Sequence, residues 1–407
     1  MRRNTSILML SVGHGCVDVY QGAVASLVPF FVAERAYSYA AVSGVVLAAS
    51  VLSSVVQPVF GLLTDRWAMP WLLPVSTLLG GLGVAVSGVC EGYVPTLACV
   101  AASGLGVAAY HPESARVARL ASRGSHSGMS WFSLGGNLGF ALAPLLVSAV
   151  VSTGFGLRLS PLLVVPAVAG SVLCLPVLRS LRVPGGAGGG SRVPAGSDDR
   201  ASFVRLSLAV VCRSVVFTGL STFVSLYAGQ RLGGGTAAGT AALFVLYLGG
   251  AVGSVLGGRL AGRWDRVAVA RWSYLAAAVA VAGLVTVPGP VLYLFVALAS
   301  IGLYVPFSLQ VTLGQDYLPS RVGTASGVTL GLTVSVGGLA SPLLGGLADA
   351  TSLQAALLPL SLMPVLSWLL FRTLPEPRVP AHLAGAREPD PGEGAGQLPV
   401  PPRQPGA

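Results

Sequence analysis

The chain has 407 residues, of which 53% are hydrophobic and only 9% are charged. Its mean hydropathy of +0.77 excludes a water-soluble domain, which could not cover its surface with so few polar side chains. The formal net charge is +10, and all 24 basic residues are arginine. Because these arginines are scattered over short segments, the charge does not indicate a nucleic-acid partner. The composition predicts a protein embedded in a lipid bilayer.

Apolar stretches of membrane-spanning length recur along the whole chain. A helix needs roughly 20 residues to cross ~30 Å of hydrocarbon. Twelve such stretches lie near residues 7–33, 41–63, 71–90, 93–115, 128–151, 159–178, 203–228, 241–262, 270–288, 290–313, 325–347 and 353–371. We predict an all-α integral membrane protein with twelve transmembrane helices in two pseudo-symmetric six-helix halves.

The arginines predict the orientation of the chain in the membrane. With both termini in the cytoplasm, 20 arginines fall on the inner side and three on the outer side, and Arg213 lies within a span. This excess follows the positive-inside rule. The first apolar run is interpreted as a span and not as a signal peptide, because it is long and contains His14 and Asp18. We predict the cytoplasmic membrane of a bacterium as the location.

Two segments lack the apolar pattern of the spans. Residues 181–202 are rich in glycine and are predicted to form a flexible cytoplasmic linker. Residues 375–407 are rich in proline and glycine and are predicted to form a disordered cytoplasmic tail. The N-terminal six-helix half is then 1–180 and the C-terminal half 203–374.

The two halves carry related segments about 197 residues apart. The segment 61–66 (Gly-Leu-Leu-Thr-Asp-Arg) has its counterpart in 258–263 (Gly-Arg-Leu-Ala-Gly-Arg). With one more residue of offset, Pro144-Leu-Leu matches Pro342-Leu-Leu. A parallel duplication of a helical membrane unit is typical of a transporter whose two bundles enclose a pathway.

The segment 61–66 resembles the signature loop of the major facilitator superfamily. The segment 135–144 is similar to a glycine and proline motif in the fifth span of drug/proton antiporters of that superfamily. In such motifs glycine permits close helix contact, aspartate caps a helix start and proline bends a helix. The resemblance implies gating or conformational roles for Gly61, Asp65, Arg66, Gly139, Pro144 and Pro342.

A narrower resemblance rests on the segments 13–18 (Gly-His-Gly-Cys-Val-Asp) and 110–113 (Tyr-His-Pro-Glu), together with 314–319 and 327–331. These segments resemble the fosmidomycin resistance transporter family over most of residues 7–372. The resemblance implies alternating access and proton-driven efflux of a drug-like molecule, such as one that bears a phosphonate.

Ionisable residues at membrane depth are energetically expensive and by default face a cavity or a partner. Asp18 lies about 11 residues into its span, roughly 16 Å along the axis, with His14 one turn before it. These two residues form either a static hydrogen bond or a pair that binds protons or substrate. Glu113 either pairs with Arg116 or titrates in the pathway. We assign proton coupling to Asp18, Glu113 and His14.

Arg213 lies about as deep in the seventh span and aligns with Cys16 at the repeat offset. Pseudo-symmetry therefore predicts a guanidinium across the central cavity from the His14 and Asp18 pair. It needs a counter-anion, which is either Asp18 or Glu113 at rest or an anionic substrate in transport. The predicted substrate-binding residues are Arg213, His111, Tyr110, Asn137 and Gln310.

These features predict a monomeric, proton-coupled secondary transporter that exports a small anionic molecule by alternating access. It needs no cofactor besides the proton gradient, and its partners are a small-molecule substrate, protons and the bilayer. Uptake of an organic anion by proton symport stays an alternative. A membrane enzyme or scaffold is a remote one, because no nucleophile–base set, metal-ligand cluster or phosphate loop appears and the four histidines are far apart in the sequence. The five cysteines show no paired spacing and are predicted to pack as small hydrophobic residues, without a disulfide or a metal.

Overall fold

The structure is a computed structural model and describes residues 3–122, 126–180 and 197–377. Contacts divide the chain into two units, Met1–Pro375 and Glu376–Ala407, and the account below concerns the first. Most of the predicted tail and residues 181–196 of the predicted linker lie outside the described residues.

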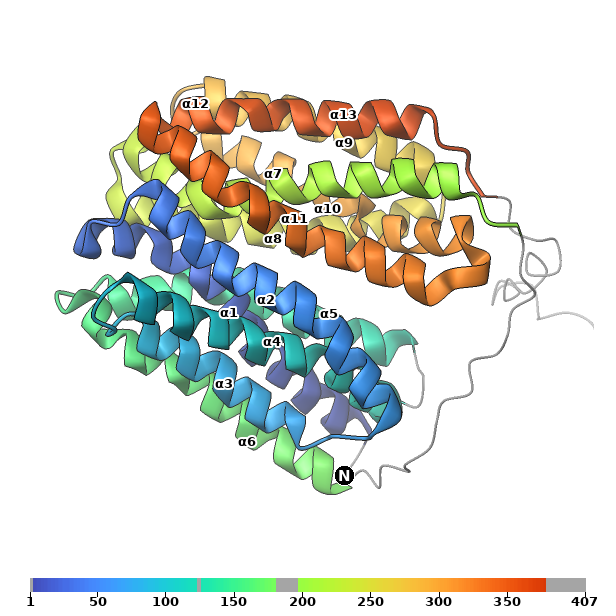
Figure 1. The fold of residues 1–407 in the computed structure, drawn as a ribbon, viewed down its shortest axis with the longest axis horizontal. Coiled ribbons are helices and arrows are strands. Elements are labelled where there is room, and N and C mark those ends of the chain that lie inside the picture. Colours follow the sequence, from blue (N-terminus) through green and yellow to red (C-terminus); the bar gives the residue numbers. More distant parts are fainter. Residues whose placement is uncertain (1–2, 123–125, 181–196, 378–407) are drawn as a thin grey trace, which may run out of the picture. The chain divides into compact units, whose positions relative to one another are not determined.

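All regular elements in the described ranges are helices (Figure 1). They are α1 (Arg3–Arg35), α2 (Tyr39–Arg66), α3 (Leu72–Ser87), α4 (Tyr93–Ser122), α5 (His126–Val151), η1 (Gly156–Val164), α6 (Val165–Ser180), α7 (Arg200–Leu232), α8 (Gly235–Ala261), α9 (Arg266–Thr286), α10 (Leu292–Tyr317), η2 (Pro319–Arg321), α11 (Val322–Ala350), α12 (Leu353–Leu357), η3 (Leu358–Ser361) and α13 (Leu362–Arg372). Ten helical segments of this part of the chain are long and apolar enough to cross a membrane, and α3 is a shorter apolar helix. Each predicted span falls on a helix or on a consecutive pair or trio of helices.

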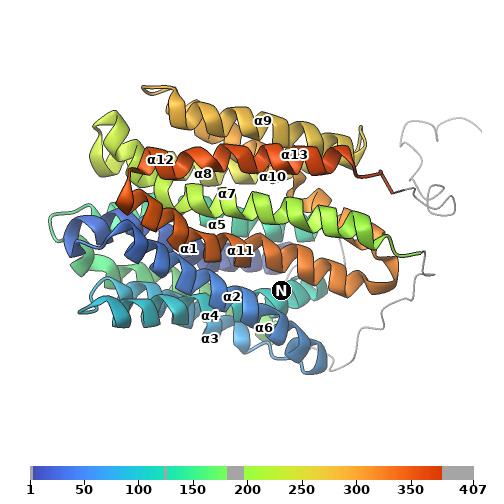
Figure 2. The ribbon, with the colours of Figure 1, turned by 45° about the horizontal axis from the view of Figure 1, so that its top comes forward.

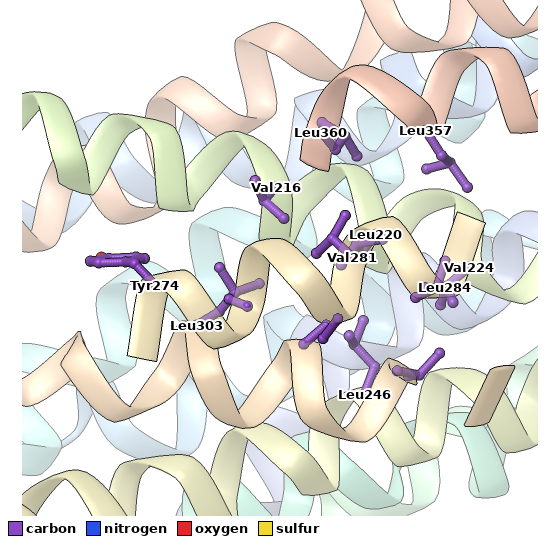
Figure 3. Packing of buried hydrophobic residues seen from close by; sticks show 14 of the residues in the cluster. Val216, Leu220, Val224, Leu246, Tyr274, Val281, Leu284, Leu303, Leu357 and Leu360 are labelled. Atoms are coloured by element: carbon purple, nitrogen blue, oxygen red, sulfur yellow. The ribbon is translucent and has the colours of Figure 1, made fainter. Parts of the chain in front are cut away.

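The N-terminal helices and the C-terminal helices each have their own hydrophobic core. One cluster draws its buried residues from positions 7–177, and the second draws nearly all of its own from 206–374. In the second cluster Val216 and Leu220 of α7 pack with residues of α8, α9 and α10 such as Leu246, Val281 and Leu303 (Figure 3). Large apolar side chains are also exposed on many helices, as a lipid-facing surface requires.

The N-terminal and C-terminal helices meet mainly along two helix pairs, α2 with α11 and α5 with α8. Figures 1 and 2 both show α2 beside α11. In that pair a Cβ atom added at Gly345 would lie 2.5 Å from the carbonyl oxygen of Tyr39, so the backbones nearly touch. In the other pair the rings of Phe140 and Tyr247 are 4.1 Å apart.

The carboxylate of Asp349, near the end of α11, caps the start of α2. Its Oδ1 accepts a hydrogen bond from the backbone N–H of Tyr39 (2.8 Å), and its Oδ2 accepts one from that of Ala40 (2.9 Å). The Tyr39 hydroxyl also accepts a hydrogen bond from Nε2 of Gln230 in α7 (2.9 Å). An anion at a helix N-terminus is favoured both by the free N–H groups and by the helix dipole. This contact therefore joins the two halves at one end of the molecule.

We expect Asp349→Ala to loosen this end of the α2–α11 pair. Loss of a helix cap costs on the order of 1 kcal/mol, which is about a fivefold change in an equilibrium between closed and open pairs. The measurement is the rate of maleimide labelling at Ser43→Cys, beside Gly345, which should rise. Ser352→Ala is the matched control, since Ser352 caps α12 within one half through the N–H of Ala355. Equal labelling rates in the two variants would contradict the prediction.

The start of α7 differs from the predicted linker. Residues 200–202 already belong to α7, because the Asp199 carboxylate accepts a hydrogen bond from the N–H of Ser202 and caps the helix. Asp198 accepts hydrogen bonds from the Ser320 N–H (3.1 Å) and hydroxyl (2.6 Å). The hydrogen bond from the Ser320 hydroxyl lowers the pKa of Asp198, and that from Ser202 lowers the pKa of Asp199. Both carboxylates therefore stay ionised at neutral pH. Asp198 joins the start of α7 to η2, and the backbone N–H of Asp199 donates to the Tyr317 carbonyl at the end of α10 (2.7 Å).

Candidate functional site

Three ionisable side chains meet between α1 and α4. On α1, His14 and Asp18 are four residues apart and therefore lie on one face, with His14 Nε2 3.2 Å from Asp18 Oδ2. From α4, Nε2 of His111 lies 3.2 Å from the other oxygen, Oδ1. The side chains of His14 and Asp18 are only 10% and 12% exposed. We call His14, Asp18 and His111 the α1–α4 trio.

The other ring nitrogen of each histidine fixes which atom faces the carboxylate. His14 Nδ1 is 2.9 Å from the carbonyl oxygen of Phe132, and His111 Nδ1 is 2.7 Å from that of Val107. A carbonyl oxygen only accepts, so each Nδ1 carries a hydrogen and each Nε2 is left to face Asp18. With both rings neutral, two lone pairs would face an anion. A proton on either Nε2 would convert that contact into a charge-assisted hydrogen bond, so the geometry of the trio can accommodate a proton.

Neighbouring polar and aromatic groups complete this site. Gln21, one turn after Asp18, donates from Nε2 to Asp18 Oδ1 (3.3 Å) and lies 3.4 Å from Nε2 of His111. The ring of His14 stacks on Phe132 at 4.2 Å. Tyr110 is fully buried beside the two histidines, and its hydroxyl makes no hydrogen bond to the residues described. Sequence reasoning missed Gln21, although its spacing of three residues from Asp18 places both on one helix face.

A backbone seam between α1 and α5 holds the trio in place. A Cβ added at Gly139 would overlap the carbonyl oxygen of Gly15, and one added at Gly135 would overlap that of Ser11. One added at Gly136 would overlap Asp18 Oδ2 and lie 2.6 Å from Cε1 of His14. Only glycine fits at these three positions of α5. The predicted importance of Gly139 thus has a geometric reason, and Gly136 is a positioning residue that the sequence did not single out.

We expect Gly136→Ala to uncouple the site while most of the protein still folds. The new methyl group must displace the Asp18 carboxylate or the His14 ring, and such overpacking typically costs about 1–3 kcal/mol. Substrate-dependent proton flux in proteoliposomes should fall at least tenfold, by the rough scale of a displaced functional group. Gly346→Ala in α11 is the matched control, because a Cβ there meets no described atom within 4 Å. Wild-type flux in Gly136→Ala would show that the trio is not held from α5.

The structure pairs Glu113 with its neighbour on α4. Arg116 donates from Nε to Oε2 of Glu113 (2.9 Å) and from Nη2 to Oε1, which makes a bidentate ion pair. The Glu113 side chain is fully buried, whereas that of Arg116 is 26% exposed. Of the two predicted alternatives for Glu113, this geometry matches the local ion pair.

Arg213 on α7 is buried without a counter-ion among the residues described. The residue is 1% exposed, and its Nε and Nη1 atoms make no hydrogen bond in this part of the chain. Its guanidinium carbon lies 5.0 Å from the ring centre of Phe307 and 5.5 Å from that of Tyr304, both on α10. Aromatic faces offset only part of the cost of burying a cation. The fork is therefore left with donors for an anion.

The remaining predicted residues are distributed as follows. Gln310, buried on α10, donates from Nε2 to the hydroxyl of Tyr274. Asn137 is half-buried on α5. Of the other predicted gating residues, Gly61 has no described atom within 4 Å of an added Cβ, and Arg66 is exposed and lies over the Trp67 ring at 4.9 Å. Pro144 is buried in α5, and Pro342 is half-buried in α11. The side chain of Asp65 lies outside the described residues.

The α1–α4 trio is also the group that a metal ion could use. Its ligand atoms, two imidazole nitrogens and a carboxylate oxygen, all lie within 4.8 Å of one another. Among the described residues no other set of three such side chains is so close. The same three atoms are equally suited to hold protons, and a proton needs no rearrangement of the side chains.

Comparisons with known proteins agree with this architecture. The family model of the Major Facilitator Superfamily matches residues 10–342. The MFS-type transporter YfnC of Bacillus subtilis (strain 168) is 29% identical over 382 residues, which cover 90% of this chain and 91% of that protein. The Fosmidomycin resistance protein of Escherichia coli (strain K12) is 28% identical over 369 residues, with 88% and 90% covered.

Solved structures of transporters share the fold. A mutant form of the nucleoside transporter NupG superimposes with a TM-score of 0.75 at 12% identity, covering 91% of this chain and 99% of that one. A bacterial homolog of the human lysosomal transporter Spinster, in an inward-facing and occupied conformation, gives 0.73 at 14% identity, covering 90% and 95%. The predicted all-helical transporter fold is confirmed, and the family shows a transporter and not an enzyme. The chain is a multi-pass membrane protein of the Major Facilitator Superfamily.

Proposed function

We propose that this protein is a proton-coupled exporter of a small anionic, drug-like molecule that works by alternating access. The observation that carries the proposal is that the two halves hold different kinds of buried ionisable group. One half holds a carboxylate between two histidines, and the other holds a buried arginine without a described counter-ion. The first is a proton site and the second an anion site, and rocking of the halves exposes both to one side of the membrane at a time.

The proton enters at the α1–α4 trio. The net charge of the trio is the sum over the Asp18 carboxylate and the two imidazoles, His14 and His111. It rises by one with each proton that binds. The groups that face this carboxylate are the two histidines, Gln21 and, farther away, the hydroxyl of Tyr110. Helix α5 contributes Gly136 and the Phe132 carbonyl, and none of its described residues brings a charged side chain to the trio. A proton arriving from the outer side makes the trio more positive and disfavours a cation close by. Release of that proton to the cytoplasm reverses the change.

The anion binds at Arg213. A guanidinium grips a phosphonate or carboxylate through two parallel hydrogen bonds, and here Nε and Nη1 both lack described partners. Tyr304 and Phe307 would pack against the apolar part of the molecule. The likeness to the Fosmidomycin resistance protein supports a phosphonate-bearing substrate of this kind.

The test is a resistance and transport screen in a bacterial strain that lacks its own efflux pumps. Expression of this protein should lower the accumulation of fosmidomycin or another small phosphonate, and collapse of the proton gradient should abolish the effect. A panel of uncharged drugs of similar size is the control. If no anion on the panel is exported and an uncharged one is, the assignment of Arg213 to substrate is wrong.

Uptake by proton symport uses the same two sites, and the direction is tested separately. Everted vesicles are prepared with an acidic interior and right-side-out vesicles are placed in an acidic exterior, and accumulation of the labelled anion is followed in both. Export predicts that accumulation in everted vesicles depends on an acidic interior. Accumulation in right-side-out vesicles driven by an acidic exterior would instead establish the symporter.

A further inference from the structure

Two of the five cysteines lie in contact where α3 is connected to α4. The Sγ atoms of Cys90 and Cys99 are 3.4 Å apart. Cys90 is in the turn between Ser87, the last residue of α3, and Tyr93, the first of α4, and Cys99 is on α4 itself. Both residues are half-buried. A disulfide needs the sulfurs to close to about 2.05 Å, and the two thiols are already in contact.

The backbone around Cys90 is held firmly, so the contact does not depend on a loose loop. Arg35, the last residue of α1, donates from Nη1 to the carbonyl oxygen of Cys90 and from Nη2 to that of Gly88 (2.8 Å). The Cys90 N–H donates to the carbonyl oxygen of Val86 (3.2 Å). The hydroxyl of Tyr93 then donates to the carbonyl oxygen of Ala41 on α2 (2.9 Å). The turn is thus fixed to both α1 and α2.

The position in the chain places this pair on the outer side of the membrane. The turn between α3 and α4 is at the same end of the helices as the turn between α1 and α2, and opposite to the N-terminus. In the orientation that the arginines predict, this end faces the oxidising side, where disulfides persist. A pair of thiols at the cytoplasmic end would be kept reduced.

We propose that Cys90 and Cys99 form a disulfide in the mature protein. The oxidant is the disulfide of a thiol-oxidising protein or of oxidised glutathione. The thiolate of one cysteine attacks this disulfide, forms a mixed disulfide and releases one donor thiolate. The thiolate of the second cysteine then attacks the first cysteine's sulfur and displaces the other donor thiolate, so that a Cys90–Cys99 bond forms. The two protons of the cysteine thiols are balanced by the two protons taken up by the donor thiolates. Two electrons pass from the cysteine sulfurs to the donor.

The bond lies within one half and does not bridge the halves. It links the turn between α3 and α4 to α4 itself, and neither of these helices belongs to the α2–α11 or α5–α8 pair. Oxidation should therefore stabilise the outer end of the N-terminal bundle without blocking the rocking motion. We expect the melting temperature of the oxidised protein to exceed that of the reduced protein by on the order of 5 °C. Transport rates of the two forms should agree within twofold.

The experiment counts free thiols in the full-length protein in nanodiscs. After treatment with reductant or with oxidised glutathione, the protein is denatured, labelled with N-ethylmaleimide and analysed by mass spectrometry. We expect five labels in the reduced protein and three in the oxidised one, with a peptide that joins Cys90 to Cys99. Cys90→Ser should abolish this peptide and the redox-dependent rise in melting temperature. Cys16→Ser is the matched control and should leave both unchanged.

A second arm examines the protein from cells. Thiols are trapped with acid at the moment of lysis, and the same peptide is sought. Five labels after oxidation of the purified protein, or a cross-link that involves Cys16, Cys174 or Cys212, would overturn the proposal. Five labels in the protein trapped from cells would also overturn it, because the pair would then face a reducing compartment. None of these outcomes depends on what the protein transports.

Discussion

Asp18→Asn should abolish substrate-dependent proton flux and leave folded protein in the membrane. The substitution changes little volume but removes the anion that holds Nε2 of both His14 and His111 at 3.2 Å. An asparagine amide can donate to one neutral imidazole, so the site no longer needs a proton to be satisfied. We expect a loss of at least tenfold, since a general proton-transfer group typically contributes about 10²–10⁴-fold. The measurement uses proteoliposomes with a trapped pH-sensitive dye, to which substrate is added.

The matched control is Asp316→Asn, which makes the same chemical change outside the trio. Asp316 pairs with Arg266 at 2.7 Å, and its side chain is 46% exposed. This variant should keep wild-type proton flux. Normal pH dependence in Asp18→Asn would pass the proton role to Glu113, and Glu113→Gln is then decisive. Intact coupling in both variants would refute the mechanism.

Glu113→Gln should affect the stability of the protein and not its proton coupling. The carboxylate is fully buried in a bidentate pair with Arg116, and breaking a buried pair costs about 3–5 kcal/mol. The variant should therefore lose folded yield and thermal stability, whereas the coupling ratio of the surviving protein should stay normal. Size-exclusion profiles and the ratio of proton to substrate flux separate the two effects.

Arg213→Lys should raise the half-saturating concentration of an anionic substrate at least tenfold. Lysine keeps the positive charge but lacks the planar fork, and one lost charge-assisted hydrogen bond is worth roughly 1.5–3 kcal/mol. Proton movement through the α1–α4 trio should survive, because the substitution leaves that site unchanged. The measurement is the concentration dependence of anion counterflow in proteoliposomes. Arg205→Lys is the matched control on the same helix, since Arg205 is exposed and donates from Nη1 to the Thr373 carbonyl (3.2 Å), away from the aromatic lining of Arg213.

A different set of results would assign Arg213 a structural role. If it only neutralises a carboxylate, Arg213→Lys should be nearly silent. Arg213→Gln should then be rescued in part by neutralising that carboxylate, either Asp18 or Glu113. Transport of an uncharged substrate at the wild-type rate by Arg213→Ala would remove the residue from the substrate site altogether.

The sequence predicted what depends on spacing along one helix. The apolar stretches located the spans, and the spacing of four residues between His14 and Asp18 predicted their contact. It also named the pairing of Glu113 with Arg116 as one of two alternatives, and the structure has these two side chains in contact.

Contacts between helices were beyond the sequence, because they depend on how each helix is rotated and shifted against its neighbour. The Phe132 carbonyl meets His14 across 118 residues, and Asp349 meets Tyr39 across 310. Gly136 lies within the motif at 135–144, but the motif does not reveal which of its glycines abuts Asp18. The contact of Cys90 with Cys99 arises from a turn whose course Arg35 fixes, which cysteine spacing alone does not reveal.

The glycine seam between α1 and α5 has a consequence for how such a transporter can evolve. At Gly135, Gly136 and Gly139 any larger residue meets a carbonyl oxygen or the trio itself. Around Arg213 the lining consists of large rings, Tyr304 and Phe307, which can be exchanged for one another or trimmed without moving a backbone. Under the proposed function, substitutions at Tyr304 and Phe307 would change which anion is bound, whereas substitutions at the three glycines would displace α1 or the α1–α4 trio. Substrate preference could then change among descendants while proton coupling is retained.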